Sequence, residues 1–185
     1  MENEDLYKKS IILIGPSGAG KSSVAEELSK ITRMPRLCLD GIANRERSNG
    51  FRNRFRSSQE YNAFMIRRAI DDAKRHGTPG IVDFGAGHSI YNDPKIFADV
   101  KKMMADFKNV VLLLPSADPN ESLRIMNERS TGDTRDNKYF LNSPCNRELA
   151  TMTIYGNGRS PREIAESILK YIETRDSKTE EKINE

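Results

Sequence analysis

The segment GPSGAGKS (residues 15–22) matches the pattern G-x-x-x-x-G-K-[ST] at every fixed position. The apolar run SIILIG (10–15) leads into it and predicts a strand, and the segment SSVAEELSKI after it predicts a helix. A glycine-rich turn between a strand and a helix presents backbone amides and a helix N-terminus to one point, and this arrangement binds phosphate. The chain is therefore predicted to contain a nucleotide-binding α/β unit.

The residues of this loop are expected to have distinct roles at a nucleotide. Lys21 is expected to reach the β- and γ-phosphates of ATP, and the Ser22 hydroxyl to bind Mg²⁺. The glycines allow the backbone to approach the phosphates closely. The candidate ATP contacts are Gly15, Ser17, Gly18, Ala19, Gly20, Lys21, Ser22 and Ser23.

Further apolar runs predict the other strands of one sheet. They lie at 36–40, 80–85, 109–115 and, more weakly, 151–156, and helical patterns separate them. Strands that alternate with helices give right-handed crossovers and an open parallel sheet. We expect a single domain over residues 1–175 and a charged flexible tail over 176–185, where six of ten residues are charged.

Bulk properties exclude several classes of protein. Two cysteines are too few for a disulfide scaffold, and the net charge of +3 does not by itself indicate nucleic acid. The apolar runs are too short to span a membrane. We expect a cytoplasmic protein without a membrane partner, and a monomer or weak dimer.

Two polar segments interrupt the alternation of strands and helices. Residues 41–58 are expected to form a binding loop, and residues 45–56 within it hold five arginines interleaved with two phenylalanines. This cluster, with Arg45 and Arg47, is interpreted either as a contact for an anionic acceptor or as a solvated, loop-flanked helix. Residues 129–146 are turn-prone and are expected to form a lid.

Cations over a transferring phosphoryl group are needed to stabilise its charge, and a lid can supply them while excluding water. Arg129 and Arg135 of the lid are the candidates for this role. Arg124, on the preceding helix, is expected to stack on adenine. Each of these arginines can also be an ordinary solvated side chain.

Polar residues follow two predicted strands at the edge where ligands of parallel sheets bind. Asp40 ends one strand and Asp83 ends another, so each can hold Mg²⁺ or take the proton of an attacking hydroxyl. The alternative is a helix cap or turn residue, which fits Asp40 before Gly41. The sequence does not decide which carboxylate has which role. After Asp83, Gly85 and Gly87 are expected to bring backbone amides to the acceptor, and His88 to donate to it, although an ordinary turn with an exposed histidine is an alternative.

The complete layout resembles the shikimate-kinase branch of the P-loop small-molecule kinases from Ser10 to about Ile172. The resemblance rests on GPSGAGKSS, the aspartate of RLCLD, the glycine-rich turn, VVLLL, the lid-like segment and the closing ELATMTIYGNGRSPREIAESIL. It implies a P-loop kinase fold: a five-stranded parallel sheet of order 2-3-1-4-5, helices on both faces and a short lid. It also implies that residues 157–159, with Arg159, pass near the adenine.

The chain departs from this family at the acceptor. The family has two acids in strand two as D-x-D, whereas this chain has Cys38 and Asp40. The two family arginines that grip the shikimate carboxylate correspond to Met65 and Ser143. A carboxylate bound there would lack its charge partner. The resemblance therefore implies phosphotransferase machinery without shikimate specificity.

The leading hypothesis is an ATP- and Mg²⁺-dependent kinase that phosphorylates a hydroxyl of a small molecule, anionic if the arginine cluster binds it. One alternative is a nucleic-acid 5′-hydroxyl kinase, in which the arginine and phenylalanine segment would bind a strand; we expect nucleic acid not to be the partner. The other alternative is a non-catalytic nucleotide-binding regulatory module.

Overall fold

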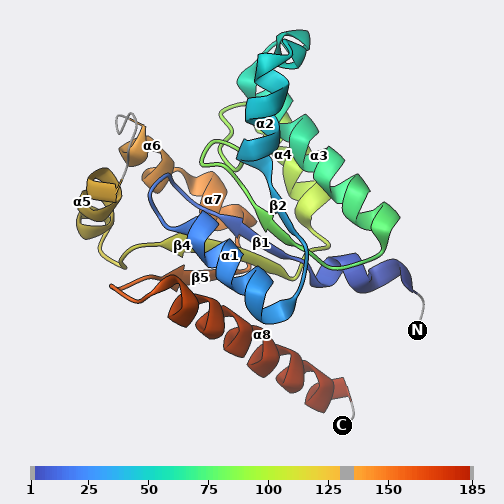
Figure 1. Cartoon of the computed structure of the whole chain (residues 1–185), viewed down its shortest axis with the longest axis vertical. Coiled ribbons are helices and arrows are strands. Elements are labelled where there is room, and N and C mark those ends of the chain that lie inside the picture. Colours follow the sequence, from blue (N-terminus) through green and yellow to red (C-terminus); the bar gives the residue numbers. More distant parts are fainter. Residues whose placement is uncertain (1–2, 130–135, 184–185) are drawn as a thin grey trace.

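The computed structural model describes residues 3–129 and 136–183. A parallel sheet of five strands in the order β2-β3-β1-β4-β5 lies at its centre (Figure 1). The strands are β1 (Ile11–Ile14), β2 (Arg36–Cys38), β3 (Ile81–Asp83), β4 (Asn109–Leu114) and β5 (Met152–Tyr155). This architecture confirms the predicted α/β fold and its strand order.

Helices cover both faces of the sheet (Figure 1). They are α1 (Lys21–Thr32), α2 (Leu39–Ser48), α3 (Ser58–His76), α4 (Pro94–Met104), α5 (Pro119–Arg129), α6 (Asn137–Asn142), α7 (Pro144–Leu149) and α8 (Pro161–Ile183), with 3₁₀ helices η1 (Asn3–Lys9) and η2 (Phe51–Arg54). One face packs against α1 and α8, and the other against α3, α4 and α7.

Strand β1 explains why both faces must be covered. All four of its residues are buried, and they alternate between two hydrophobic clusters. Ile11 and Leu13 pack with α1 and α8, whereas Ile12 and Ile14 pack with α3 and α4. Successive side chains of a strand point to opposite faces, so a continuous apolar run is stable only between two layers of helices.

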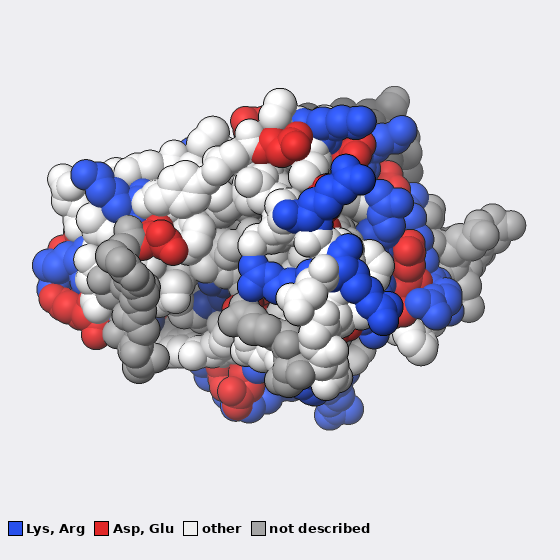
Figure 2. Space-filling model, turned by 90° about the horizontal axis from the view of Figure 1, so that it is seen from above, with Lys and Arg blue, Asp and Glu red and all other residues white. Residues whose placement is uncertain are grey.

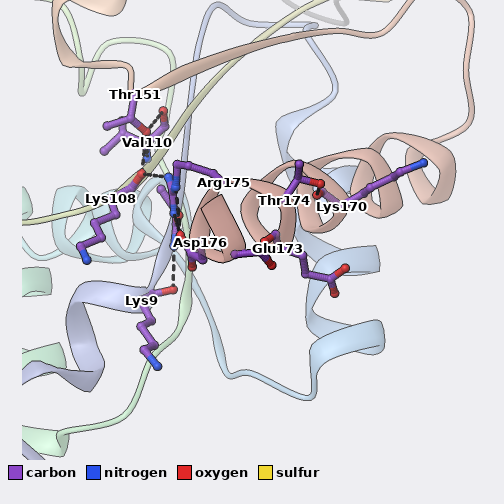
Figure 3. A network of polar contacts seen from close by, with 11 residues as sticks. Lys9, Lys108, Val110, Thr151, Lys170, Glu173, Thr174, Arg175 and Asp176 are labelled. Carbon is purple, nitrogen blue, oxygen red and sulfur yellow. Dashed lines mark hydrogen bonds and ion pairs between the residues drawn. The ribbon is translucent and has the colours of Figure 1, made fainter. Parts of the chain in front are cut away.

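The amino ends of the strands are tied together by polar contacts at the far end of α8 (Figure 3). The Arg175 guanidinium donates to the Lys108 carbonyl at 2.6 Å and to Asn109 Oδ1 at 2.8 Å. The Thr151 hydroxyl donates to the same Lys108 carbonyl at 2.8 Å, and Asn109 Nδ2 donates to the Lys9 carbonyl at 3.1 Å. This edge of the sheet is thereby closed by structural contacts.

Two segments differ from the sequence prediction. Residues 41–58, expected as a binding loop with a loop-flanked helix as the alternative for its arginine cluster, form most of α2 and all of η2, because Leu39, Ile42 and Ala43 recur at helical spacing and pack inward. Helix α8 extends to Ile183, so residues 176–183, expected as part of a flexible tail, continue a helix. Lysine and glutamate, which dominate that stretch, are good helix formers.

Candidate active site

The phosphate-binding loop connects β1 to α1 as the sequence predicts. Gly15 has φ of 138°, and a Cβ there would lie 2.6 Å from the Leu113 carbonyl oxygen. Gly18 has φ of 73°, and a Cβ there would lie 2.7 Å from the Met126 carbonyl oxygen. The loop therefore packs directly on the backbone of β4 and α5, and only glycine fits at these two positions.

The N-terminus of α1 is open to a ligand. Gly20 caps the helix without a side-chain hydrogen bond to its amides, and the first turn holds no acidic residue. The first amides of a helix have no partner within the helix, and together with the helix dipole they favour an anion. Ser22 and Ser23 are exposed in this turn.

Lys21 is buried and points back to its own loop. Its Nζ donates to the Pro16 carbonyl at 2.8 Å. Burial lowers the pKa of Lys21, and the nearby carboxylates of Asp83 and Asp40 oppose that shift. Since the hydrogen bond of Lys21 goes to a carbonyl of its own loop, the amine can exchange that carbonyl for a phosphate oxygen when a nucleotide binds.

A cavity of about 700 Å³ opens over this loop at the carboxyl ends of the strands. Residues 17–24 form one wall, and the remainder is lined by Asp40, Phe84, Ala86, Pro115, Arg129, Gly156, Gly158, Arg159, Pro161 and Ile164. Seen from above, this face of the molecule is hollowed, and Lys and Arg side chains gather beside the hollow (Figure 2). The cavity has the size of a small-molecule site.

Asp83, the last residue of β3, is held by an ion pair. Its side chain is 3% exposed, and Oδ2 accepts from Arg36 Nη2 at 2.9 Å. Arg36, the first residue of β2, was not among the predicted site residues. Side chains two positions apart on a strand point to the same face, and Cys38 is the Cα partner of Asp83. Arg36, two residues before Cys38, could therefore have been expected on the face of Asp83.

Asp40 lies in the first turn of α2, two residues after β2 ends, and not at the end of the strand as predicted. Its side chain is 62% exposed and lines the cavity. The carboxylate rests on the backbone of Gly85: a Cβ there would lie 2.5 Å from Asp40 Oδ2 and still closer to Oδ1. Asp40 and Asp83 are thus an open and a buried carboxylate near the same lysine.

The turn after β3 is ordered differently from the prediction. Gly87 accepts at its carbonyl from Asn62 Nδ2 at 2.8 Å, which fastens the turn to α3. His88, expected either to donate to an acceptor or to be an exposed turn residue, is buried and is not among the described residues that line the cavity. Its Nδ1 lies 3.7 Å from Asp40 Oδ1 instead.

The predicted arginines separate into different environments. Arg129, at the end of α5, and Arg159 line the cavity. Arg159 is fixed by hydrogen bonds to the Gly156 and Tyr155 carbonyls and the Ser167 hydroxyl. Arg124 is exposed and pairs with two glutamates of its own helix.

Part of the expected lid lies outside the described residues. Residues 130–135, which include Arg135, belong to that part, and the rest of the segment forms α6 and the start of α7. The lid therefore stays a prediction.

The described arginines of residues 45–56 do not form a clamp above Asp40. Arg52 lies over the Tyr61 ring at 6.0 Å and Arg54 over the Phe51 ring at 5.1 Å. Arg45 is exposed, and the side chain of Arg47 lies outside the described part of the chain. None of the described arginines of residues 45–56 lines the cavity.

The residues at the two family clamp positions are buried. Met65 joins the cluster of α2, η2 and α3, and Ser143 lies before α7. Neither carries a charge that could bind a carboxylate.

The donor set suits Mg²⁺. Ser22 and Asp40 line one cavity, and Asp83 acts electrostatically on the lysine of the same site. A few hydroxyl and carboxylate oxygens beside substrate phosphates are what Mg²⁺ takes, because it keeps several waters. Among the described residues, no group of three or more histidine, cysteine, aspartate or glutamate side chains could hold a metal by itself.

Comparison with known proteins places the fold among small-molecule kinases. No protein-family model and no curated protein sequence matches the chain. Among solved structures, shikimate kinase from Acinetobacter baumannii in complex with shikimate superposes with a TM-score of 0.69 at 19% identity, covering 94% of this chain and 98% of that chain.

Two other kinases are also similar. A gluconokinase from Sinorhizobium meliloti 1021 gives a TM-score of 0.58 at 15% identity, covering 93% of this chain and 98% of that one. The APS kinase of Mycobacterium tuberculosis, in complex with AMPPNP and APS, gives 0.51 at 18% identity, covering 89% and 97%. The chain thus has the fold of the P-loop small-molecule kinases. The predicted likeness to shikimate kinases is confirmed at the level of the fold.

No helix in the described residues is long and apolar enough to cross a membrane.

Proposed function

We propose that the protein transfers the γ-phosphoryl group of ATP to a hydroxyl group of a small molecule. The observation that carries the proposal is one cavity lined by both the phosphate-binding loop with Lys21 and the open carboxylate of Asp40. The fold shared with shikimate kinase and gluconokinase supports the same class of reaction. Shikimate itself is not supported as the acceptor, because Met65 and Ser143 are buried and uncharged.

The two carboxylates receive different roles in this proposal. Asp40 is exposed to the cavity and takes the proton of the acceptor hydroxyl. Asp83 is buried and already paired with Arg36, so it is poorly placed to accept that proton. Ser22, which lines the cavity, would hold Mg²⁺, and the buried Asp83 would act on the ion only electrostatically; when bound, Mg²⁺ neutralises charge on the phosphates.

The remaining chain positions the reactants. The loop amides and α1 bind the β- and γ-phosphates, and Lys21 leaves the Pro16 carbonyl to contact them. The acceptor oxygen then bonds to the γ-phosphorus as the bond to the bridging oxygen breaks and ADP leaves. Arg129 faces the same cavity and stabilises the charge of the transferring group.

A nucleic-acid acceptor receives less support from the structure. Stacking of bases requires exposed aromatic faces. Phe51, Phe55 and Phe64 pack on one another with centroid distances of 5.1 to 5.7 Å and belong to the cluster under α2. These rings are half-buried, and their contacts with one another leave less of their faces free for bases.

The test is ATP consumption measured with Mg²⁺ against a panel of hydroxylated acids, sugars, nucleosides and 5′-hydroxyl oligonucleotides. Wild type is compared with Lys21→Met and Asp40→Asn. Lys30→Met is the matched control, because Lys30 lies on the same helix but is exposed and pairs with Glu26 and Glu27. We expect one small-molecule class to raise turnover in wild type and Lys30→Met only. If no acceptor exceeds the Lys21→Met background, the proposal fails.

A further inference from the structure

His88 is a rigidly held side chain behind the candidate base. Its backbone N–H donates to the Gly85 carbonyl at 3.0 Å, and its carbonyl accepts from the Tyr91 hydroxyl at 2.7 Å. The ring packs against Phe84 with centroids 6.3 Å apart, and the side chain is 5% exposed. A side chain that is buried in this way and does not line the cavity is poorly placed to bind a ligand there.

The two ring nitrogens have unequal surroundings. Nδ1 lies 3.7 Å from Asp40 Oδ1, whereas Nε2 is buried and has no hydrogen-bond partner in the described part of the structure. A neutral imidazole carries its proton on one of the two nitrogens, and a buried N–H without an acceptor is costly. A proton on Nδ1 would face the Asp40 carboxylate, whereas a proton on Nε2 would have no acceptor among the described residues. The surroundings therefore favour a proton on Nδ1.

The charge state of the ring agrees with that arrangement. Burial lowers the pKa of His88, although Asp40, the Gly85 backbone and Asp83 oppose the shift and Lys21 adds to it. The imidazole is therefore neutral near pH 7 and carries one proton. With this proton on Nε2, the Nδ1 lone pair would face the Asp40 carboxylate and repel it.

We propose that His88 is a positioning residue for Asp40: its Nδ1–H donates to Asp40 Oδ1 and holds the other carboxylate oxygen toward the cavity. The proposal rests on the proposed function, in which Asp40 accepts the proton of the acceptor hydroxyl. The 3.7 Å separation needs to shorten by about 0.7 Å to reach an ordinary N–H···O distance of about 3.0 Å. Asp40 is the exposed partner and can make this movement by rotating its side chain, while His88 stays fixed.

The pairing can be tested without an acceptor. The chain holds two histidines, so His76→Gln, at the exposed end of α3, leaves His88 as the single imidazole. In protein labelled with ¹⁵N-histidine, long-range ¹H–¹⁵N spectra near neutral pH should show the Nδ1–H tautomer, and Asp40→Ala should shift the Nδ1–H resonance. An Nε2–H tautomer in wild type, or a resonance that Asp40→Ala leaves unchanged, would overturn the proposal.

The catalytic consequence is tested with MgATP alone, using slow hydrolysis by water. Asparagine places its Nδ2 near the position of Nδ1, whereas leucine keeps the bulk and removes the donor. We expect His88→Leu to lower kcat about tenfold with an unchanged KM for MgATP, and His88→Asn to stay within about threefold of wild type. Equal losses in both variants, at equal unfolding midpoints, would overturn the positioning role. If wild type hydrolyses no ATP and no acceptor is found, the proposed function fails, and the NMR result alone decides whether His88 pairs with Asp40.

Discussion

Gly85→Ala is expected to displace the Asp40 carboxylate while leaving the stability of the fold nearly unchanged. A Cβ at this position would lie 2.5 Å from Asp40 Oδ2 and still closer to Oδ1, and an ordinary contact begins at 3.4 Å, so the carboxylate must move by considerably more than about 0.9 Å. Gly85 has no positive φ, so alanine adds no backbone strain. The exposed Asp40 side chain can swing into solvent, and the cost to the free energy of unfolding should stay below about 1 kcal/mol. A misplacement of about 1 Å at a reacting group can cost about a hundredfold in rate.

The assay compares kcat, nucleotide affinity and urea unfolding in wild type, Gly85→Ala and Gly41→Ala. Gly41 is the neighbour of Asp40 in α2, and a Cβ there would meet only Cys38 atoms at 3.8 Å, so it controls for an added methyl group. We expect Gly85→Ala to lose most of kcat with near-normal nucleotide affinity, and Gly41→Ala to keep kcat. A Gly85→Ala protein with wild-type kcat would refute the assignment of Asp40 as the base, and a loss that follows unfolding would refute the geometric argument.

Three other perturbations probe the charges of the site. Lys21→Met should abolish thermal stabilisation by MgADP without lowering the unfolding midpoint of the free protein, because it removes a buried charge whose pKa burial lowers; stabilisation equal to wild type would contradict the role of Lys21. Because the pKa of His88 is lowered below its ordinary value of 6.5, the unfolded chain binds more protons as the pH falls below 6.5, and wild type should lose up to about 1.4 kcal/mol of unfolding free energy per pH unit there. Urea unfolding at several pH values checks this, and a slope that His88→Asn does not reduce would exclude His88 as its source. Arg36→Leu should destabilise the protein by about 2 kcal/mol, because it leaves the Asp83 carboxylate buried without its partner; adding Asp83→Asn should recover most of that loss in the same unfolding assay.

The geometry of the loop between β1 and α1 could be predicted from the sequence because it is built from the backbone. The loop from Gly15 to Gly20 needs only glycine spacing, a preceding apolar strand and a following helix, and these are local properties. The five strands could be predicted for a similar reason, since runs such as 11–14 are apolar on both faces. Their boundaries differ from the predicted ones by at most two residues.

The segment 41–58 shows where local patterns left two interpretations open. Its arginines and asparagines indicated a binding loop or a solvated, loop-flanked helix, and Leu39, Ile42 and Ala43 supply the apolar face that packs inward to form α2. His88 was expected at a ligand or in solvent because nothing local in the sequence indicates burial. Its surroundings come from Phe84 of the same turn and from Asp40, which is far away in the chain. Contacts between distant elements decided both cases, and a single sequence does not contain them.

The register of two strands explains how the site keeps two acids despite the missing D-x-D pattern. Cys38 stands where the family has the first acid, and its Cα partner across the β2–β3 ladder is Asp83. Registered residues of parallel strands point to the same face, so a carboxylate on β3 occupies the face where a carboxylate on β2 is absent. The charges of Asp83 and Cys38 both act to raise the pKa of Lys21, which agrees with a shared location of the two residues. Arg36, two residues before Cys38, lies on that face as well and neutralises Asp83. The acid on β3 is therefore paired and buried, whereas Asp40 is the exposed carboxylate, which is why the proposed function assigns the acceptor hydroxyl to Asp40.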